Sequence, residues 1–300
     1  MAKAVYVGVG SKARKMKKAY IGIGGKARKV KKMYIGVGGK ARLCYSAEAD
    51  KFGMAASLSK ARSLLAGTTV GGYALFGGGG YDSDAKKGEA IMDAYNASLT
   101  RTTATPLPSN AYACAGGTVG GYAVFSGGSS MNSDSTLVET IGAMEIVRAY
   151  DSSLTSSKAA PLSCPRAVHS AATIGNHLLF AGGYNSTTGK YLSTVESYDA
   201  SLTRSTAVEL SSAKNGPASA TVGEYAMFAG GYKGNSDAAY VATVDAYNTA
   251  LTKTTMPDLS VGRYGLASAV IGDYALFAGG ISKISSTADK YQDVVDVYSA

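Results

Sequence analysis

Few residues of this 300-residue chain could perform covalent chemistry. It contains two histidines, His169 and His177, and three cysteines, Cys44, Cys114 and Cys164. Neither set has the spacing of a metal site. The chain also lacks a serine-nucleophile elbow, a zinc motif and a marked pair of catalytic carboxylates. We therefore expect a protein that is not an enzyme, has no cofactor or metal, and keeps its thiols reduced.

The residues best suited to binding are tyrosines in loops that follow Gly-Gly pairs. These loops are rich in Tyr, Ser, Asn, Asp and Gly. This composition suits a recognition surface, because tyrosine supplies rigid aromatic area and the other side chains supply adaptable hydrogen bonds. We predict a binding face for a glycan or a protein, with these candidate residues: Tyr81, Tyr184, Tyr191, Tyr232, Tyr240 and Tyr291. The alternative, that surface loops are simply polar, stays open.

These loops belong to a repeat. A phrase close to Gly-x-Tyr-Ala-Leu-Phe-x-Gly-Gly occurs at Gly71–Gly79, Gly120–Gly128, Gly175–Gly183, Gly223–Gly231 and Gly272–Gly280. Its aromatic position recurs after 49, 55, 48 and 49 residues, which is the period of a supersecondary unit copied in a ring or an array. Each copy predicts four short strands, β-branched and aromatic with glycine turns, as in a β-propeller blade.

The two ends of the repeat region predict how a ring would close. The last copy stops at Ala300 after its third strand, whereas Asp50–Ser59 ends in Leu-Ser like a fourth segment. We predict that residues 48–59 supply the missing strand and pair beside Val294–Tyr298, because closure removes exposed sheet edges. The expected fold is all-β: a five-bladed propeller over residues 45–300, with four strands per blade and an N-terminal strand closing the ring.

Two positions of the repeat carry opposite charges. Four copies have a base before the first strand, at Arg62, Arg166, Lys214 and Arg263, and an acid in the third strand, at Asp93, Glu196, Asp245 and Asp296. The second copy has Ala111 and Arg148 instead. Joint loss favours an ion pair within each blade, since a lone buried charge is costly. The four bases are also candidate ligand-binding residues, because a partly exposed cation could meet an anionic ligand.

The repeat resembles the Kelch family. Arg166-Ala167-Val168-His169-Ser170-Ala171, then Gly182-Gly183 and later Tyr198-Asp199, follow the family's pattern. The tryptophan that the family carries on its fourth strand is absent, because the chain contains no Trp. The resemblance covers residues 45–300 and implies a propeller that binds proteins or glycans or, rarely, performs redox chemistry. The fold alone does not decide among these.

Residues 1–44 form a separate basic arm. A 14-residue unit recurs around Tyr6, Tyr20 and Tyr34, and each copy predicts a short β-hairpin. The arm holds 13 of the 30 Lys and Arg residues and none of the 21 acidic ones. Three hairpins bury little surface, so we expect the arm to be ordered by self-association, as a homo-oligomer, or on a partner. Its candidate contact residues are Tyr6, Tyr20, Tyr34, Arg14, Arg28 and Arg42.

The arm resembles the tandem Tyr-[Ile/Val]-Gly-[Ile/Val]-Gly-Gly-Lys-Ala-Arg repeats at the start of virion and tail-associated proteins of bacteriophages and prophages. That resemblance implies a virion component, such as a tail fibre, a baseplate or a head decoration. The arm would bind other virion proteins, and the propeller would bind a host-surface glycan or protein.

Two alternatives to the virion role stay open. One is a bacterial Kelch-type protein-binding scaffold without a virion. The other is a nucleic-acid-associated protein whose arm contacts phosphates. We expect no membrane insertion, because no apolar run reaches the roughly 18 residues of a membrane span. The N-terminus lacks the apolar core of a secretory signal, so we expect synthesis in a bacterial cytoplasm.

Overall fold

The computed structural model consists of strands, turns and loops. It describes short strands within residues 6–46 and then residues 55–80, 88–130, 142–234, 239–285 and 288–299. The chain divides into two compact units, Met1–Met54 and Ala55–Ala300. The boundary expected after residue 44 falls inside a strand, because Lys40–Ser46 stays paired as far as Ser46. In the described residues, no helix is long and apolar enough to cross a membrane.

The first unit contains the three predicted hairpins, each of them antiparallel. They are β1 (Tyr6–Val9) with β2 (Lys12–Lys15), β3 (Tyr20–Ile23) with β4 (Lys26–Lys29), and β5 (Lys32–Val37) with β6 (Lys40–Ser46). The arm's candidate contact residues lie on these strands. Tyr6, Tyr20 and Tyr34 are on the first strand of a hairpin, and Arg14, Arg28 and Arg42 are on the second.

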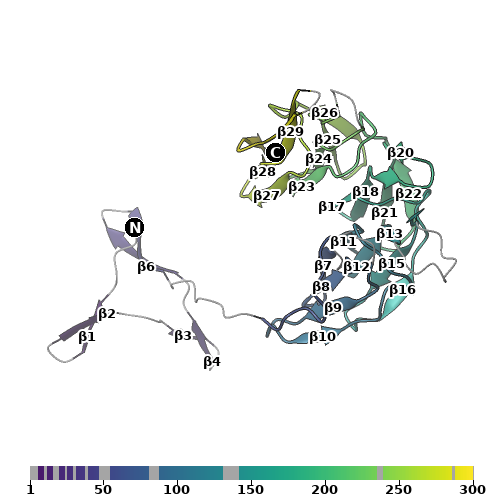
Figure 1. Ribbon diagram of the computed structural model, residues 1–300. Coiled ribbons are helices and arrows are strands. Elements are labelled where there is room, and N and C mark those ends of the chain that lie inside the picture. The colour runs from purple at the N-terminus through teal and green to yellow at the C-terminus, as the bar shows by residue number, and fades with distance from the viewer. Residues whose placement is uncertain are drawn as a thin grey trace. The chain divides into compact units, whose positions relative to one another are not determined.

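The second unit contains a row of similar antiparallel sheets, which we call blades one to five in chain order. Blades one to four each have four strands among the described residues, and blade five has three. The strands are β7 (Ala66–Val70), β8 (Tyr73–Gly77), β9 (Met92–Tyr95) and β10 (Arg101–Thr103); β11 (Ala115–Val119), β12 (Tyr122–Ser126), β15 (Val147–Tyr150) and β16 (Ser156–Lys158); β17 (Ser170–Ile174), β18 (His177–Ala181), β21 (Val195–Tyr198) and β22 (Arg204–Ala207); β23 (Ala218–Val222), β24 (Tyr225–Ala229), β25 (Val244–Tyr247) and β26 (Lys253–Met256); and β27 (Ala267–Ile271), β28 (Tyr274–Ala278) and β31 (Val295–Ser299). Figure 1 shows the blades following one another in chain order along an arc.

Short paired segments lie between the second and third strands of three blades. They are β13 (Ser129–Ser130) with β14 (Gly142–Ala143), β19 (Tyr184–Asn185) with β20 (Lys190–Tyr191), and β29 (Ile281–Ser285) with β30 (Ala288–Tyr291). In blades three and five these pairs are the bases of loops in which binding tyrosines were predicted: Tyr184 and Tyr191 in blade three, and Tyr291 in blade five.

Local turns explain why each copy folds alike. In blade one, the Gly-Gly pair after the second strand is Gly78-Gly79, with φ values of 67° and 96°. A Cβ on Gly78 would lie 2.4 Å from the Ala111 carbonyl oxygen. Only glycine allows this close approach without strain. Between the third and fourth strands, the Asn96 side-chain oxygen accepts hydrogen bonds from the backbone N–H groups of Ser98 and Thr100. Asp151, Asp199 and Asn248 repeat this turn, which suits Asn and Asp.

The core lies between adjacent blades. One cluster joins Ile174, Leu179 and Val195 of blade three to Ala226 and Phe228 of blade four. Inner strands are also joined by hydroxyl groups: Thr173 donates to the Thr118 carbonyl at 2.7 Å, and Thr221 donates to the Thr173 carbonyl at 2.9 Å. Each blade therefore depends on its neighbours for burial, as expected of a repeat protein.

The two ends of the row carry faces that the inner blades bury. In blade five, Ile271 is 68% exposed, while the equivalent Val222 of blade four is 2% exposed. Val295 and Val297 are also exposed. In blade one, Ala74 and Phe76 are half-buried, whereas the equivalent Ala226 and Phe228 are fully buried.

The pairing predicted between residues 48–59 and Val294–Tyr298 falls mostly outside the described residues. Residues 55–59 form no strand, and β31 pairs with β28 alone among the residues described. The number of blades in a closed ring therefore stays a prediction.

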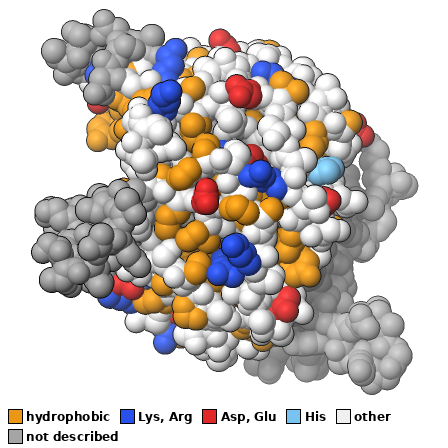
Figure 2. Space-filling model, turned by 90° about the vertical axis from the view of Figure 1, so that its right-hand side faces the viewer, with side chains coloured by type: hydrophobic (Ala, Val, Ile, Leu, Met, Phe, Trp, Pro, Cys, Tyr) orange, Lys and Arg blue, Asp and Glu red, His pale blue; other side chains and the backbone are white. Residues whose placement is uncertain are grey.

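Charged side chains are dispersed on the face drawn in Figure 2. There, Lys and Arg side chains of the described residues alternate with Asp and Glu among apolar and uncharged groups. This distribution agrees with a sequence whose basic excess lies in residues 1–44.

Candidate functional site

The loop bases of blades three, four and five carry tyrosines at equivalent positions. The residue after each Gly-Gly pair bridges to the end of its own loop: Tyr184 to Tyr191, Tyr232 to Tyr240, and Ile281 to Tyr291. It also bridges to the segment before the first strand, as Tyr232 does to Asn215 and Ile281 does to Tyr264. Because this register repeats, the same positions of neighbouring blades lie side by side.

Five tyrosines from these positions form one aromatic group, which we call the tyrosine cluster: Tyr184, Tyr191, Tyr232, Tyr240 and Tyr264. The ring-centroid distances are 5.0 Å for Tyr184–Tyr191, 5.8 Å for Tyr191–Tyr232, 5.6 Å for Tyr232–Tyr240 and 5.9 Å for Tyr232–Tyr264. All five side chains are half-buried. Blades three, four and five therefore share a continuous aromatic surface, with Tyr232 at its centre.

The surroundings of the cluster make room for its rings. Gly216 has a φ of 54°, and a Cβ there would lie 2.5 Å from the Tyr264 ring. Burial raises the pKa of Tyr191, Tyr240 and Tyr264, and the Asp289 carboxylate beside Tyr240 adds to the effect there. The phenol groups of these three tyrosines therefore stay protonated near neutral pH and keep both donor and acceptor capacity.

Blades one and two have no such surface at the equivalent bridging positions after the Gly-Gly pair and at the loop end. These positions hold Gly80, Gly88, Ser129 and Ala143.

Among the predicted binding residues, Tyr184, Tyr191, Tyr232 and Tyr240 are brought together. Tyr291 is 82% exposed and has no ring contact with the cluster among the described residues. Tyr81 lies outside the described residues.

Sequence reasoning missed Tyr264. It comes directly after Arg263, where the other blades have Ser63, Tyr112, Ala167 and Asn215. Its position one residue after the repeated base was the available signal.

The predicted ion pairs are present in four blades. Arg62 contacts Asp93 at 2.9 Å, Arg166 contacts Glu196 at 3.1 Å, and Lys214 contacts Asp245 at 3.5 Å. Arg263 also pairs with Asp296. The side chains of all four bases are completely buried. They therefore offer no exposed atom to an anionic ligand, and this geometry favours the structural interpretation of Arg62, Arg166, Lys214 and Arg263.

A serine completes each of these networks. The backbone N–H groups of Ser59, Ser163, Ser211 and Ser260 donate to the four acids. Burial raises the pKa of Asp93, but hydrogen bonds from Ser59 and Arg62 outweigh it and hold that pKa below its usual value. Burial lowers the pKa of Lys214 to about 8, against the attraction of Asp245.

Blade two has lost all three members of the network. Its equivalents are Pro108, Ala111 and Arg148, and proline has no N–H to donate. A cavity of about 10 Å³, enough for one water molecule, lies beside Ala111. In blade five the Arg263 guanidinium donates to the carbonyl groups of Phe277, Gly279 and Val294. The equivalent residues of blade two line the cavity: Phe125, Gly127 and Ile146.

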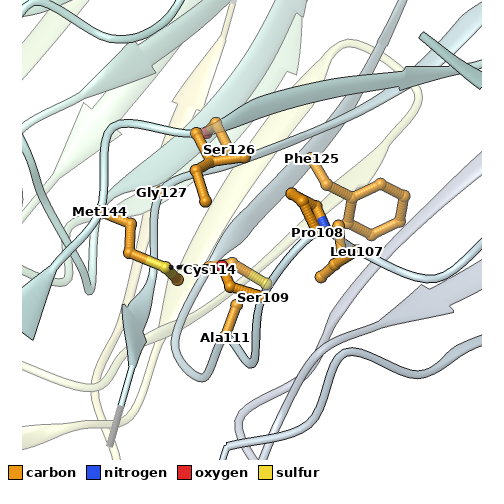
Figure 3. A pocket seen from close by; sticks show the side chains of 10 residues that line it. Leu107, Pro108, Ser109, Ala111, Cys114, Phe125, Ser126, Gly127 and Met144 are labelled. Carbon is orange, nitrogen blue, oxygen red and sulfur yellow. Dashed lines mark hydrogen bonds between the residues drawn. The ribbon is translucent and has the colours of Figure 1, made fainter. Parts of the chain in front are cut away.

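One thiol and two serine hydroxyl groups also belong to residues that line the cavity. Figure 3 shows Cys114 and Ser126 in its lining, with Ser109 donating to the Met144 sulfur at 3.2 Å. Burial raises the pKa of Cys114 to about 11. The Ser126 hydroxyl lies 2.8 Å from His169 Nε2, and burial, helped by the charge of Arg166, lowers the pKa of His169 to about 3. A protonated thiol and a neutral, buried histidine favour packing roles here.

His177 also has a packing role in this geometry. It begins β18, is half-buried and lies with Nδ1 3.1 Å from the Ser197 hydroxyl. In the described residues, no group of three or more His, Cys, Asp and Glu side chains could hold a metal ion.

Comparisons with known proteins support the fold. The Kelch motif matches residues 165–201. The solved structure of YjhT is similar, with a TM-score of 0.59 and 15% sequence identity, over 92% of this chain and 95% of that one. No curated protein sequence matches this chain. The second unit therefore has the β-propeller fold, with a Kelch motif at residues 165–201, and an identity this low carries no information on function.

Proposed function

We propose that this chain is a non-enzymatic binding protein whose tyrosine cluster binds a carbohydrate. The observation that carries the proposal is the row of touching tyrosine rings across blades three, four and five. Aromatic faces pack against the C–H face of a sugar ring, while phenol groups exchange hydrogen bonds with its hydroxyls. Half-buried rings lose little further freedom on binding, which favours affinity.

A glycan array with the full chain tests this proposal. The strongest hit is then titrated against Tyr232→Ala, Tyr232→Phe and the control Tyr274→Ala, an exposed tyrosine outside the cluster. Tyr232→Ala should lose about 2 kcal/mol, as central aromatic residues of binding sites do. Tyr232→Phe should lose less, and the control should bind like the parent. Absence of any glycan hit, or equal binding by the folded Tyr232→Ala protein, would reject the proposal.

The proposal gives the arm an anchoring role in a phage or prophage virion. It rests on the resemblance of residues 1–44 to the tandem repeats of virion proteins, and on three hairpins too small to bury a core. Other virion proteins, or further copies of this chain, would be its partners. Sedimentation of the protein with phage particles from the producing bacterium would support this role. A protein found only in the soluble fraction would favour a bacterial scaffold without a virion.

A nucleic-acid role for the arm is the second candidate, favoured by its 13 basic and no acidic residues. Binding through phosphates would weaken steeply as salt rises. A DNA titration of full-length protein and of a 45–300 fragment, each at two salt concentrations, distinguishes the nucleic-acid role of the arm from the anchoring role. Salt-sensitive binding lost with the arm would support this candidate.

We also propose that the propeller ring is closed, with five blades, by residues 48–59. Tyr95 of blade one donates to the Ala56 carbonyl at 2.8 Å. Tyr198 and Tyr247 make the same bond to Ala160 and Val208, which follow the fourth strand of the preceding blade. Residues 55–59 thus stand where the end of a fourth strand is expected. The bare faces of blades one and five support closure, because they carry the residues that the inner blades bury against each other.

A further inference from the structure

A hollow larger than the cavity beside Ala111 also lies beside blade two, and none of its lining residues belongs to the tyrosine cluster. Its volume is about 240 Å³, and its lining includes Pro108, Pro161, Glu145, Arg148 and Lys158. Arg148 belongs to β15 and Lys158 to β16, so two adjacent strands supply its cations. Pro108 is the residue that replaces the network serine in this blade.

The two cations face each other across the strand pair. Arg148 lies directly opposite Lys158 in the register of β15 and β16. At the same positions blades one, three and four place an acid opposite a threonine: Asp93 and Thr103, Glu196 and Thr206, and Asp245 and Thr255. Like charges directly opposite each other destabilise an antiparallel pair. Blade two therefore carries two positive charges where its relatives carry one negative charge.

The described residues of blade two contain no ion-pair partner for these cations. Among the described residues, no side-chain hydrogen bond or ion pair engages Arg148 or Lys158. By contrast, Lys253 of blade four lies 3.8 Å from Asp245. In the other blades, this position of the third strand holds an acid that pairs with a base before the first strand. Blade two has Ala111 in place of that base, so Arg148 has no charged partner there. Glu145 is the carboxylate in the lining, and one acid against two bases leaves the hollow with a net positive charge.

We propose that this hollow binds an oxyanion, a phosphate, sulfate or carboxylate group, between Arg148 and Lys158. A planar guanidinium can donate two parallel hydrogen bonds to such a group, and an ammonium adds a third donor and a second charge. The flanking prolines and Ala159 give the hollow apolar walls. Its volume admits an oxyanion together with part of the molecule that carries it. The site does not depend on the tyrosine cluster, so either can fail while the other stands.

The proposal is tested by titrating the full chain with inorganic phosphate at low salt. Calorimetry and NMR measure the binding. Saturable binding should occur with a Kd of about 1 mM and weaken as salt rises. Lys158→Thr should weaken it roughly tenfold, the effect of losing one charged hydrogen bond, and Arg148→Met should weaken it more, because it removes two such bonds. The threonine is the residue that blades one, three and four carry there, so the fold should tolerate it. Glu145→Gln should tighten binding severalfold, because it removes a repelling carboxylate.

Lys190→Thr is the matched control, since it removes an exposed lysine from blade three. Sulfate and glucuronate are titrated in parallel, with glucose as the uncharged partner of glucuronate. Tighter binding of glucuronate than of phosphate would indicate an acidic sugar as the ligand, and the reverse order a phosphate group. The proposal is overturned if no oxyanion saturates the protein, if Lys158→Thr binds as the parent does, or if Lys190→Thr loses as much affinity.

Discussion

The buried ion pair of blade three should dominate the stability of that blade. Arg166 donates to Glu196 at 3.1 Å, to the carbonyl groups of Gly182 and Thr194, each at 3.2 Å, and to the Cys164 sulfur at 3.5 Å. Arg166→Met removes all four bonds and leaves Glu196 buried with its hydrogen bonds from Ser163 alone. Removing one partner of a buried pair costs about 3–5 kcal/mol, because the other charge stays buried without compensation.

Glu196→Gln in the same protein should recover part of that loss. The amide keeps an acceptor for the Ser163 N–H and carries no charge, so the double variant should be about 1–3 kcal/mol more stable than the sum of the single effects. Urea unfolding followed by circular dichroism measures all four proteins of the cycle. Arg204→Met controls for the substitution itself, since Arg204 lies nearer the surface and, among the described residues, donates to the Pro161 carbonyl at 2.7 Å and to no other group. A coupling below about 0.5 kcal/mol would refute the pair as a source of stability.

Three further outcomes are expected. The pKa of His169 falls from 6.5 to about 3 on folding, so the unfolded chain binds the proton more tightly and acid favours unfolding. Lowering the pH from 7 to 5 should cost the parent about 2 kcal/mol in urea unfolding, and His169→Gln should lose most of this dependence. Burial raises the pKa of Cys114 to about 11. Its thiol should therefore resist alkylation at pH 8 in the native protein but not in urea, and fast native labelling would contradict the raised pKa. A 60–300 fragment should melt lower than a 55–300 fragment, because it lacks the Ser59 donors to Asp93; equal melting temperatures would count against both that network and ring closure.

Much of the fold could be predicted from the sequence because each blade is a local unit. The repeated Gly-Gly pairs and the Asn or Asp turns act within a few residues, so their spacing is visible along the chain. The ion pairs could also be predicted, since Ala111 and Arg148 changed together in the second copy. The third partner of that change, Pro108, was visible but had no meaning until Ser59, Ser163 and their equivalents were seen donating to the acids.

Loop composition predicted four members of the tyrosine cluster. It did not indicate that their rings touch, and Tyr264 lies outside these loops, one residue after the repeated base. The contacts depend on how one blade packs beside the next, and on the space left at Gly216. The hollow at Arg148 and Lys158 is a similar case, because the two residues are ten positions apart and meet only through the strand register.

The sequence by itself therefore determined the repeat, the all-β blades, the basic arm and the pairing of bases with acids. Each of these follows from short-range periodicity or from covariation among the copies of one repeat. Only the tertiary structure decided which side chains form a surface and which are buried. Burial is a property of neighbouring blades, as Ile271 and Val222 illustrate: they occupy equivalent positions and differ in exposure from 68% to 2%. Burial also distinguishes two arginines. Arg166 is completely buried and has a structural role, whereas Arg148 is half-buried and is a proposed binding residue.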